Sequence, residues 1–192
     1  TGPSARAEIR FRDDERLFLR PSSELRIRDW RLPEVGPGER VLELVAGGLR
    51  AVTGAIGNRD ADDYRMITPN ATMGVRGTRY AIRVCAAGEC RMGAGEDAAA
   101  LRAGVYVGVS AGRVALLNAG GEAELGAGEF GYVADPVSAP RPADADVAGV
   151  VYTEAERADA RAAAAKRADA DGGDDTPWWW AVGGAVLLGL AL

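Results

Sequence analysis

Histidine is absent from the 192 residues of this chain, and Lys166 is its one lysine. Without imidazole, there is no histidine base to activate a serine or cysteine and no histidine ligand for a metal ion. Lys166 also lies far along the chain from Ser22, Ser23 and Ser110, which argues against a serine–lysine pair. We therefore expect no active site, and the sequence predicts a protein that is not an enzyme.

Lysine and arginine together are outnumbered by aspartate and glutamate. The chain has 23 Lys and Arg against 28 Asp and Glu, for a formal net charge of -5. Binding to nucleic acid depends on clustered cationic side chains that face phosphates, so we expect no nucleic-acid partner. Two cysteines without histidine do not complete the four ligands of a structural zinc site. We expect neither a metal nor a cofactor.

The sequence does contain alternating apolar and polar residues. Ile9 and Phe11 share one face, and Leu17 and Leu19 continue it. Short apolar runs then recur at intervals of roughly ten residues, as in all-β sandwiches, barrels and solenoids. Trp30 to Arg40 is read as a loop because of its Pro and Gly residues. The expected strands after it are 41–45, 49–53, 64–68, 78–85, 104–110, 113–117, 122–125 and 129–133. We predict an all-β domain over residues 1–135.

The composition changes after this domain. Residues 136–152 are rich in Pro, Ala and Asp, which is typical of a linker. Residues 153–171 predict a polar, solvated helix, since Thr153 and Glu156 form a capping box and Ala dominates. An acidic, Gly-containing linker follows over 172–177.

The last segment, 178–192, is uncharged and apolar. It begins with Trp178, Trp179 and Trp180, which suit the boundary of a lipid bilayer. It is shorter than the ~20 residues that span a hydrocarbon core, so we expect the start of a membrane anchor that is cut before its end. A C-terminal helix docked on the β-domain is the alternative, although a docked helix normally keeps a polar face.

The two cysteines, Cys85 and Cys90, flank Ala-Ala-Gly-Glu at the end of an expected strand. Cysteines in such positions reach disulfide distance across a hairpin turn. A disulfide is expected in an oxidising compartment, whereas the thiols would stay reduced in the cytosol. A catalytic redox pair is disfavoured because four residues, not two, separate the cysteines.

The run from Tyr64 to Thr78 is the most informative part of the chain. It combines a Pro that disfavours helix with two glycines placed for close backbone approach or positive φ. This run, with blocks at 11–19, 104–109 and 125–130, resembles the FecR domain family. The residues that match the signature of the family are Thr68, Pro69, Thr72, Gly74, Arg76, Gly77 and Thr78.

The resemblance implies a solenoid-like or jelly-roll-like FecR domain, with one or two strands and a signal peptide before Thr1. It also implies a periplasmic, signal-sensing protein that binds a protein partner at the bacterial envelope. The expected C-terminal segment would anchor the chain in the inner membrane. The order departs from the FecR plan, because the apolar segment follows the domain and no anti-sigma region is visible. This departure puts iron signalling in doubt.

Three residues are candidates for partner contact. Trp30 is expected to be an exposed aromatic in the loop after the first strands, with Arg28 and Arg31 beside it. The alternative is that Trp30 covers one end of the core. Arg76 is either a recognition side chain or, as we prefer, a buried or half-buried residue that fixes the fold.

A cell-wall or polysaccharide-binding domain is the second functional hypothesis. The low aromatic content of 6% is mild evidence against it.

Overall fold

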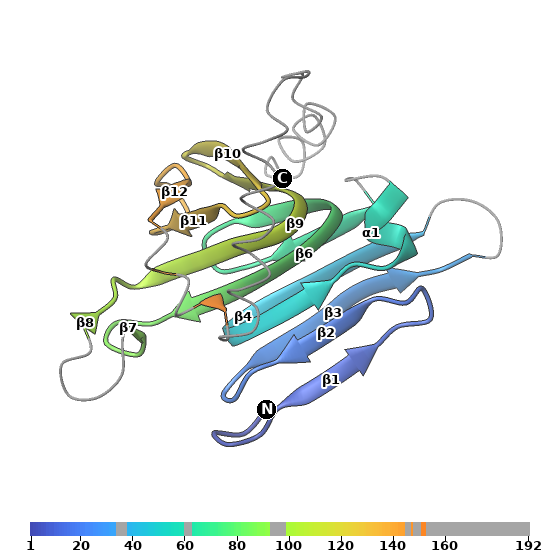
Figure 1. Ribbon diagram of the computed structural model, residues 1–192, viewed down its shortest axis with the longest axis horizontal. Coiled ribbons are helices and arrows are strands. Elements are labelled where there is room, and N and C mark those ends of the chain that lie inside the picture. The colour runs from blue at the N-terminus through green and yellow to red at the C-terminus, as the bar shows by residue number, and fades with distance from the viewer. Residues whose placement is uncertain (34–37, 60–62, 93–98, 145–146, 148–150, 153–192) are drawn as a thin grey trace, which may run out of the picture.

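The computed structural model describes residues 1–33, 38–59, 63–92, 99–144, 147 and 151–152 (Figure 1). One five-residue helix, α1 (Ala55–Arg59), accompanies the strands. The strands are β1 (Ala7–Arg10), β2 (Arg16–Leu19), β3 (Glu24–Arg31), β4 (Glu39–Val52), β5 (Tyr64–Ile67), β6 (Thr72–Cys85), β7 (Arg91–Met92), β8 (Ala99–Ala100), β9 (Gly104–Asn118), β10 (Gly121–Gly126), β11 (Phe130–Val133) and β12 (Arg141–Ala143).

Ten strands form one main sheet in the order β1-β2-β4-β5-β6-β9-β11-β12, with β3 beside β4 and β10 beside β9. Every neighbouring pair is antiparallel except β4 and β5. Figure 1 places β1 and β12 at opposite ends of this open sheet. The all-β prediction is confirmed. The described strands form one open sheet, and the stacked parallel rungs of the expected solenoid-like arrangement are not seen in it.

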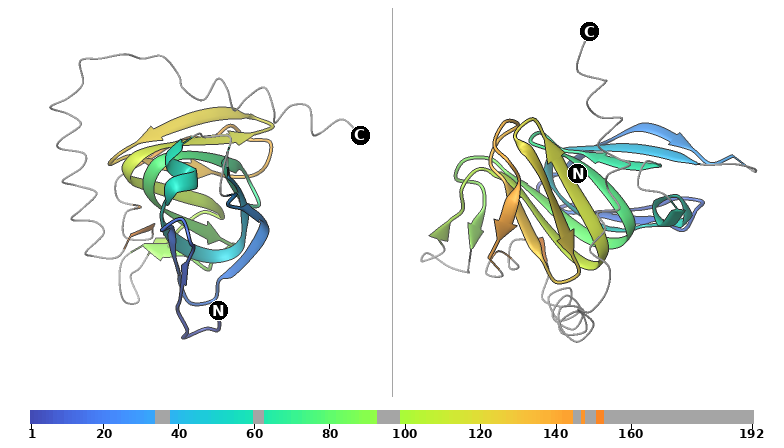
Figure 2. Two further views of the ribbon diagram at one scale, coloured as in Figure 1. Left: turned by 90° about the vertical axis from the view of Figure 1, so that its right-hand side faces the viewer. Right: turned by 90° about the horizontal axis from the view of Figure 1, so that it is seen from above.

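Three long strands, β4, β6 and β9, give the sheet its curvature. Each contains a glycine with positive φ near its middle: Gly47 (φ 80), Gly77 (φ 60) and Gly112 (φ 75). At such positions an irregular residue bends and twists a strand without ending it. The predicted pairs of strands 41–45 with 49–53 and 104–110 with 113–117 are therefore single bent strands. Figure 2 shows the resulting strongly curved sheet.

The main core lies inside this curve. In β4 the buried Leu42 and Leu44 alternate with the half-buried Glu43, as expected for a strand with one buried face. Full burial of a leucine side chain stabilises a fold by about 1.5–3 kcal/mol. The core is completed by buried residues from β2, β5, β6, β9, β10 and β11, among them Leu17, Met66, Met73, Ile82, Val107, Leu116, Leu125 and Val133.

A second apolar cluster covers the opposite face of β6 and β9. Ala81 and Tyr106 belong to it, whereas their chain neighbours Ile82 and Val107 belong to the main core. Val151 and Tyr152 pack against this second cluster. The folded region therefore extends past Asp135 into residues for which the sequence favours a linker. Strand β12 also lies there.

The predicted polar helix 153–171, the linker 172–177 and the apolar segment 178–192 lie outside the described residues. Among the residues that are described, no helix is long and apolar enough to cross a membrane.

Candidate functional site

The outer edge of β3 is the most prominent candidate for partner contact. Within the described residues, β3 pairs with β4 and with no other strand (Figure 1). A strand edge of this kind presents backbone N–H and C=O groups that another chain can bind by adding a strand. The sequence did not identify this edge, because a strand's neighbours are set by long-range pairing.

Two exposed apolar side chains lie on or beside this edge. Ile27 is 51% exposed and Leu32 is 40% exposed. Ile27 stands opposite the fully buried Leu42 in the register of β3 and β4. Together with Val137, they are the large hydrophobic side chains that are exposed in the described part of the chain. The apolar side of the sheet therefore continues to β3 without being covered there.

Charged side chains surround these apolar residues. Arg28 donates from Nε to Glu43 Oε2 at 2.6 Å. Arg31 pairs with Asp29 at 3.0 Å and also with Glu39. Arg26 pairs with Glu24 at 2.6 Å. Exposed pairs of this kind add little stability, but charges on an edge strand discourage unspecific pairing between sheets.

Trp30 lies in β3, so its predicted position in an exposed loop is wrong. Its side chain is half-buried, and its ring centroid is 6.1 Å from that of Phe11. Phe11 in turn lies against the guanidinium of Arg40, 4.0 Å from ring centroid to Cζ. Trp30 thus packs against the folded domain while part of its side chain stays exposed, and a contact role for it stays a prediction. Ile27 and Leu32 provide the exposed apolar surface instead.

A buried charged cluster lies beneath Phe11. Arg40 is fully buried and donates to Asp13 Oδ1 at 2.7 Å, and it also pairs with Glu15. Tyr64 donates to Glu15 Oε1 at 2.7 Å, and its hydroxyl is 2.8 Å from that of Tyr80. Burial raises the pKa of Tyr64 well above its usual value, and the neighbouring Tyr80 raises it further.

This cluster ties three segments together. Asp13 Oδ2 accepts a hydrogen bond from Ile56 N at the start of α1, at 3.3 Å. The β1–β2 turn, α1 and β4 are thereby fixed to one another. Neighbouring acidic residues such as Asp13 and Asp14 are typical of a hairpin turn. The turn is present, with Asp14 at φ 68, but Asp13 points inward. No feature of the local sequence distinguishes the buried Asp13 from the exposed Asp14.

The signature residues build backbone geometry rather than a pocket. Thr68 Oγ1 accepts from Ala71 N at 3.1 Å and donates to Ala71 O at 2.7 Å, which closes the turn containing Pro69. Thr78 N donates to Thr53 Oγ1 at 2.9 Å. Thr72, Gly74 and Gly77 lie in β6, where Gly77 forms the bend.

Arg76 also lies in β6, and its side chain is exposed. The preferred expectation that it is buried or half-buried is therefore wrong. It lies at the bend of the strand, opposite Arg113 of β9. A partner-recognition role for Arg76 stays a prediction.

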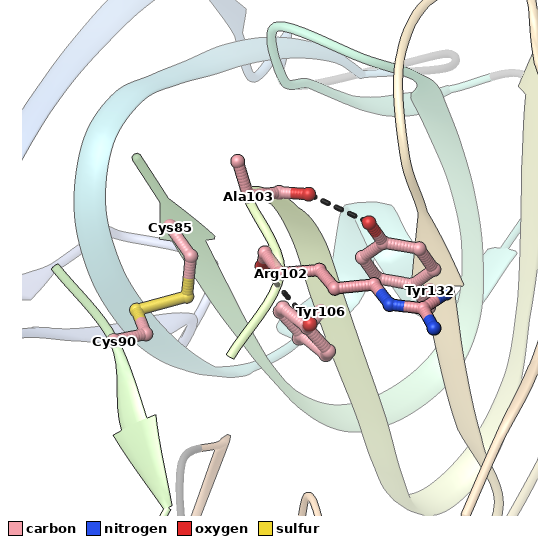
Figure 3. The surroundings of a disulfide bond; sticks show 6 residues. All are labelled: Cys85, Cys90, Arg102, Ala103, Tyr106 and Tyr132. Carbon is pink, nitrogen blue, oxygen red and sulfur yellow. Dashed lines mark hydrogen bonds between the residues drawn. A yellow bond between two sulfur atoms is a disulfide. The ribbon is translucent and has the colours of Figure 1, made fainter. Parts of the chain in front are cut away.

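The expected disulfide is confirmed. Cys85 and Cys90 are bonded, with their Cα atoms 5.5 Å apart (Figure 3). Both are buried in the second apolar cluster. The bond links the end of β6 to the residue before β7. Among the described residues, no group of three or more side chains is arranged to hold a metal ion.

The described residues thus form one open, bent and mostly antiparallel sheet, with a disulfide at the end of β6. The model of the FecR protein family matches residues 1–115. The chain therefore belongs to the FecR protein family, as the signature residues indicated.

Solved structures with a similar fold include two crystal structures of a "putative anti-sigma factor" from Parabacteroides distasonis ATCC 8503, at 1.65 and 2.50 Å resolution. Each is 15% identical to this chain, with a TM-score of 0.54. The alignment covers 78% of this chain and 60% of theirs, so the chain spans about three-fifths of their length. At this identity the likeness shows the fold alone. No curated protein matches the chain.

Proposed function

We propose that this protein is a non-enzymatic FecR-domain module that senses or relays a signal at the bacterial envelope by binding a protein partner along β3. Family membership and the fold shared with proteins described as anti-sigma factors support a role in signalling. The observation that carries the proposal is the outer edge of β3, which pairs with no strand in the described part of the chain and has Ile27 and Leu32 exposed on and beside it.

The disulfide supports an extracytoplasmic location. The chain has two cysteines, and they are bonded to each other. Disulfides persist in the periplasm and are rare in the cytosol, where thiols are kept reduced. Anchoring in the inner membrane through residues 178–192 belongs to the same proposal and rests on the sequence of that segment.

Partner binding follows from the geometry of the edge. A partner segment that adds as a strand would bond to the free backbone groups of β3 and cover Ile27. Full burial of one such side chain contributes about 1.5–3 kcal/mol, so Ile27 and Leu32 could supply the apolar centre of a small contact. Arg28 and Arg31 would form its polar rim, where charges affect association rate and specificity more than affinity.

The test uses the full chain with a photo-crosslinking amino acid at position 27. The protein is incubated with a bacterial envelope extract and irradiated, and the proteins that it retains are identified. We expect one protein to form a covalent adduct at position 27 and not at position 137, which is 72% exposed and lies outside β3. Ile27→Lys should weaken retention of that protein at least tenfold, because a buried lysine opposes strand pairing. Val137→Lys is the matched control and should retain it fully.

Equal crosslinking at positions 27 and 137, or retention unchanged by Ile27→Lys, would refute the β3 contact. Trp30→Ala is less informative than the sequence suggested, since Trp30 packs on Phe11 and its removal also disturbs the domain. Glycan assayed in the same extracts addresses wall binding. Aligned exposed aromatics would favour that hypothesis, and none of the aromatic side chains in the described residues is fully exposed.

A further inference from the structure

A cavity of about 270 Å³ lies beside the disulfide, at the end of the sheet opposite β1. It is bordered by β9, β11, β12 and the segment after β8. Leu101 and Val147 contribute apolar surface, and Tyr106 and Tyr132 contribute aromatic surface. Arg102 and Arg141, both exposed, also line the cavity. The sheet order places β4, β6 and β9 between this cavity and β3.

The two tyrosines form a rigid aromatic wall. Their ring centroids are 4.8 Å apart, with an angle of 42° between the ring planes. Tyr106 donates its hydroxyl hydrogen to Arg102 O at 3.0 Å, and Tyr132 donates to Ala103 O at 2.6 Å (Figure 3). These bonds attach the Arg102–Ala103 segment to β9 and β11, so the backbone that carries Arg102 is held in place.

Two cations face this wall. The guanidinium of Arg141 lies over the ring of Tyr132, with 5.0 Å between Cζ and the ring centroid. Figure 3 shows the side chain of Arg102 extending toward Tyr132. Burial raises the pKa of Tyr106, while Arg102 and Arg141 both act in the opposite direction, as cations near its hydroxyl do.

The charge of the cavity is positive. Within the described residues, neither Arg102 nor Arg141 forms an ion pair. Asp144 also borders the cavity, and it is the one carboxylate among the lining residues. Two guanidinium groups against one carboxylate leave a net positive charge for an incoming anion.

We infer that this cavity binds a carboxylate group of a peptide, from an acidic side chain or from a chain terminus. The planar guanidinium forms two parallel hydrogen bonds with a carboxylate, which makes arginine the preferred partner for this group. The tyrosine wall and Leu101 favour a ligand whose anionic group is attached to carbon. A volume of about 270 Å³ has room for one such side chain or terminus, not for a large cofactor.

The disulfide helps to hold the site. Leu101 N donates to Cys90 O at 2.9 Å, so the residue before Arg102 is attached directly to a bridged cysteine. Reduction of the Cys85–Cys90 bond would release this attachment from the end of β6. Carboxylate binding should therefore be weaker in the reduced protein than in the oxidised protein.

The test is an NMR titration of the isotopically labelled full chain with two probes. N-acetyl-glutamate α-amide represents an acidic side chain, and N-acetyl-alanyl-alanine represents a chain terminus. Their uncharged controls are N-acetyl-glutamine α-amide and the amide of the dipeptide. We expect saturable shifts at Tyr106 and Tyr132 with at least one carboxylate, and binding at least about tenfold weaker with its amide, the loss expected for a charge-assisted bond.

Arginine variants locate the charge. Arg102→Gln and Arg141→Gln should each weaken binding of the carboxylate about tenfold. Arg76→Gln removes another exposed arginine, in β6, and should leave the affinity unchanged. Ile27→Lys should also leave it unchanged, which separates this site from the proposed contact at β3. Reduction of the disulfide should lower the affinity.

Equal affinity for carboxylate and amide in the native protein would overturn the inference, and so would the absence of saturable binding. This comparison needs no variant and remains decisive even if an arginine substitution disturbs folding. Tighter binding of inorganic phosphate or glucuronate than of both peptide carboxylates would also overturn it, because the site would then prefer a different class of anion. Which peptide probe binds more tightly identifies the source of the carboxylate.

Discussion

Arg40 Nη2 lies 2.7 Å from Asp13 Oδ1, and both side chains are completely removed from solvent. The two residues are 27 positions apart in the chain. Glu15 pairs with the same guanidinium, so one buried cation faces two buried carboxylates. Charges taken out of water are stabilising only when their partners and hydrogen bonds are in place. This arrangement makes the end of the sheet near α1 sensitive to single substitutions.

Replacement of Arg40 by Met should be strongly destabilising. Asp13 and Glu15 would stay buried without a cation, and the loss of one partner from a buried ion pair typically costs about 3–5 kcal/mol. The measurement is the free energy of unfolding from urea titration of the full chain. Arg28→Met breaks the exposed pair with Glu43 and is the matched control, with an expected change within about 1 kcal/mol. Similar effects of the two substitutions would contradict the assigned role of the cluster.

The tyrosine pair predicts an order of stability. Tyr64→Phe removes the donor to Glu15 and the partner of the Tyr80 hydroxyl, so we expect a loss of about 1–3 kcal/mol. Tyr80→Phe leaves the Tyr64–Glu15 bond intact and should cost less, closer to about 1 kcal/mol. Urea titration near neutral pH compares the two variants. The reverse order would show that the bond to Glu15 is not the important one.

The same tyrosines predict a loss of stability in alkali. Burial raises the pKa of Tyr64 and of Tyr80 in the folded protein above the value of about 10 expected in the unfolded chain. The folded state then holds these protons more tightly. Their contribution is complete below pH about 10 and declines as the pH rises above it. Urea midpoints between pH about 8 and about 11 should fall less steeply in Tyr64→Phe than in the native protein. Parallel curves would contradict this account.

The disulfide should contribute modest stability. Cys85 and Cys90 are five positions apart, so the bond closes a short loop and restricts the unfolded chain by about 2 kcal/mol in the loop-entropy estimate. We expect Cys85→Ser with Cys90→Ser to lower the free energy of unfolding by about that amount. Reduction of the native protein should produce the same change. A reductant effect that persists in the double variant would show that it does not act through this bond.

The bend of β9 should tolerate no side chain. A Cβ on Gly112, at φ 75, would lie 2.3 Å from Gly77 O and 2.8 Å from Thr78 Cγ2. Gly112→Ala is therefore expected to cost at least about 2 kcal/mol, from backbone strain and from the clash with β6. Gly88→Ala is the control, since Gly88 has φ 78 but open space around its Cβ position. It should cost about 1 kcal/mol from strain alone. Equal losses would remove the steric argument.

Features that depend on local patterns could be predicted from the amino-acid sequence. Alternation of apolar and polar residues predicted the all-β class and most strand positions. The spacing of Cys85 and Cys90 predicted their bond, and the run from Thr68 to Thr78 identified the family. In these cases a few neighbouring residues carry the whole signal, because side-chain direction, turn geometry and loop closure are short-range properties.

Features that join distant segments became visible in the three-dimensional structure alone. The predicted strands 104–110 and 113–117 are separate, yet the pairing of β6 with β9 continues on both sides of Gly112. The Arg40 cluster, the open edge beside Ile27 and the cavity between Arg102 and Arg141 each need strands that are far apart in the chain. Which strands become neighbours depends on which long-range pairings bury the most apolar surface. The favoured pairing depends on the free energies of alternative pairings over the whole chain, so it cannot be predicted from a local pattern.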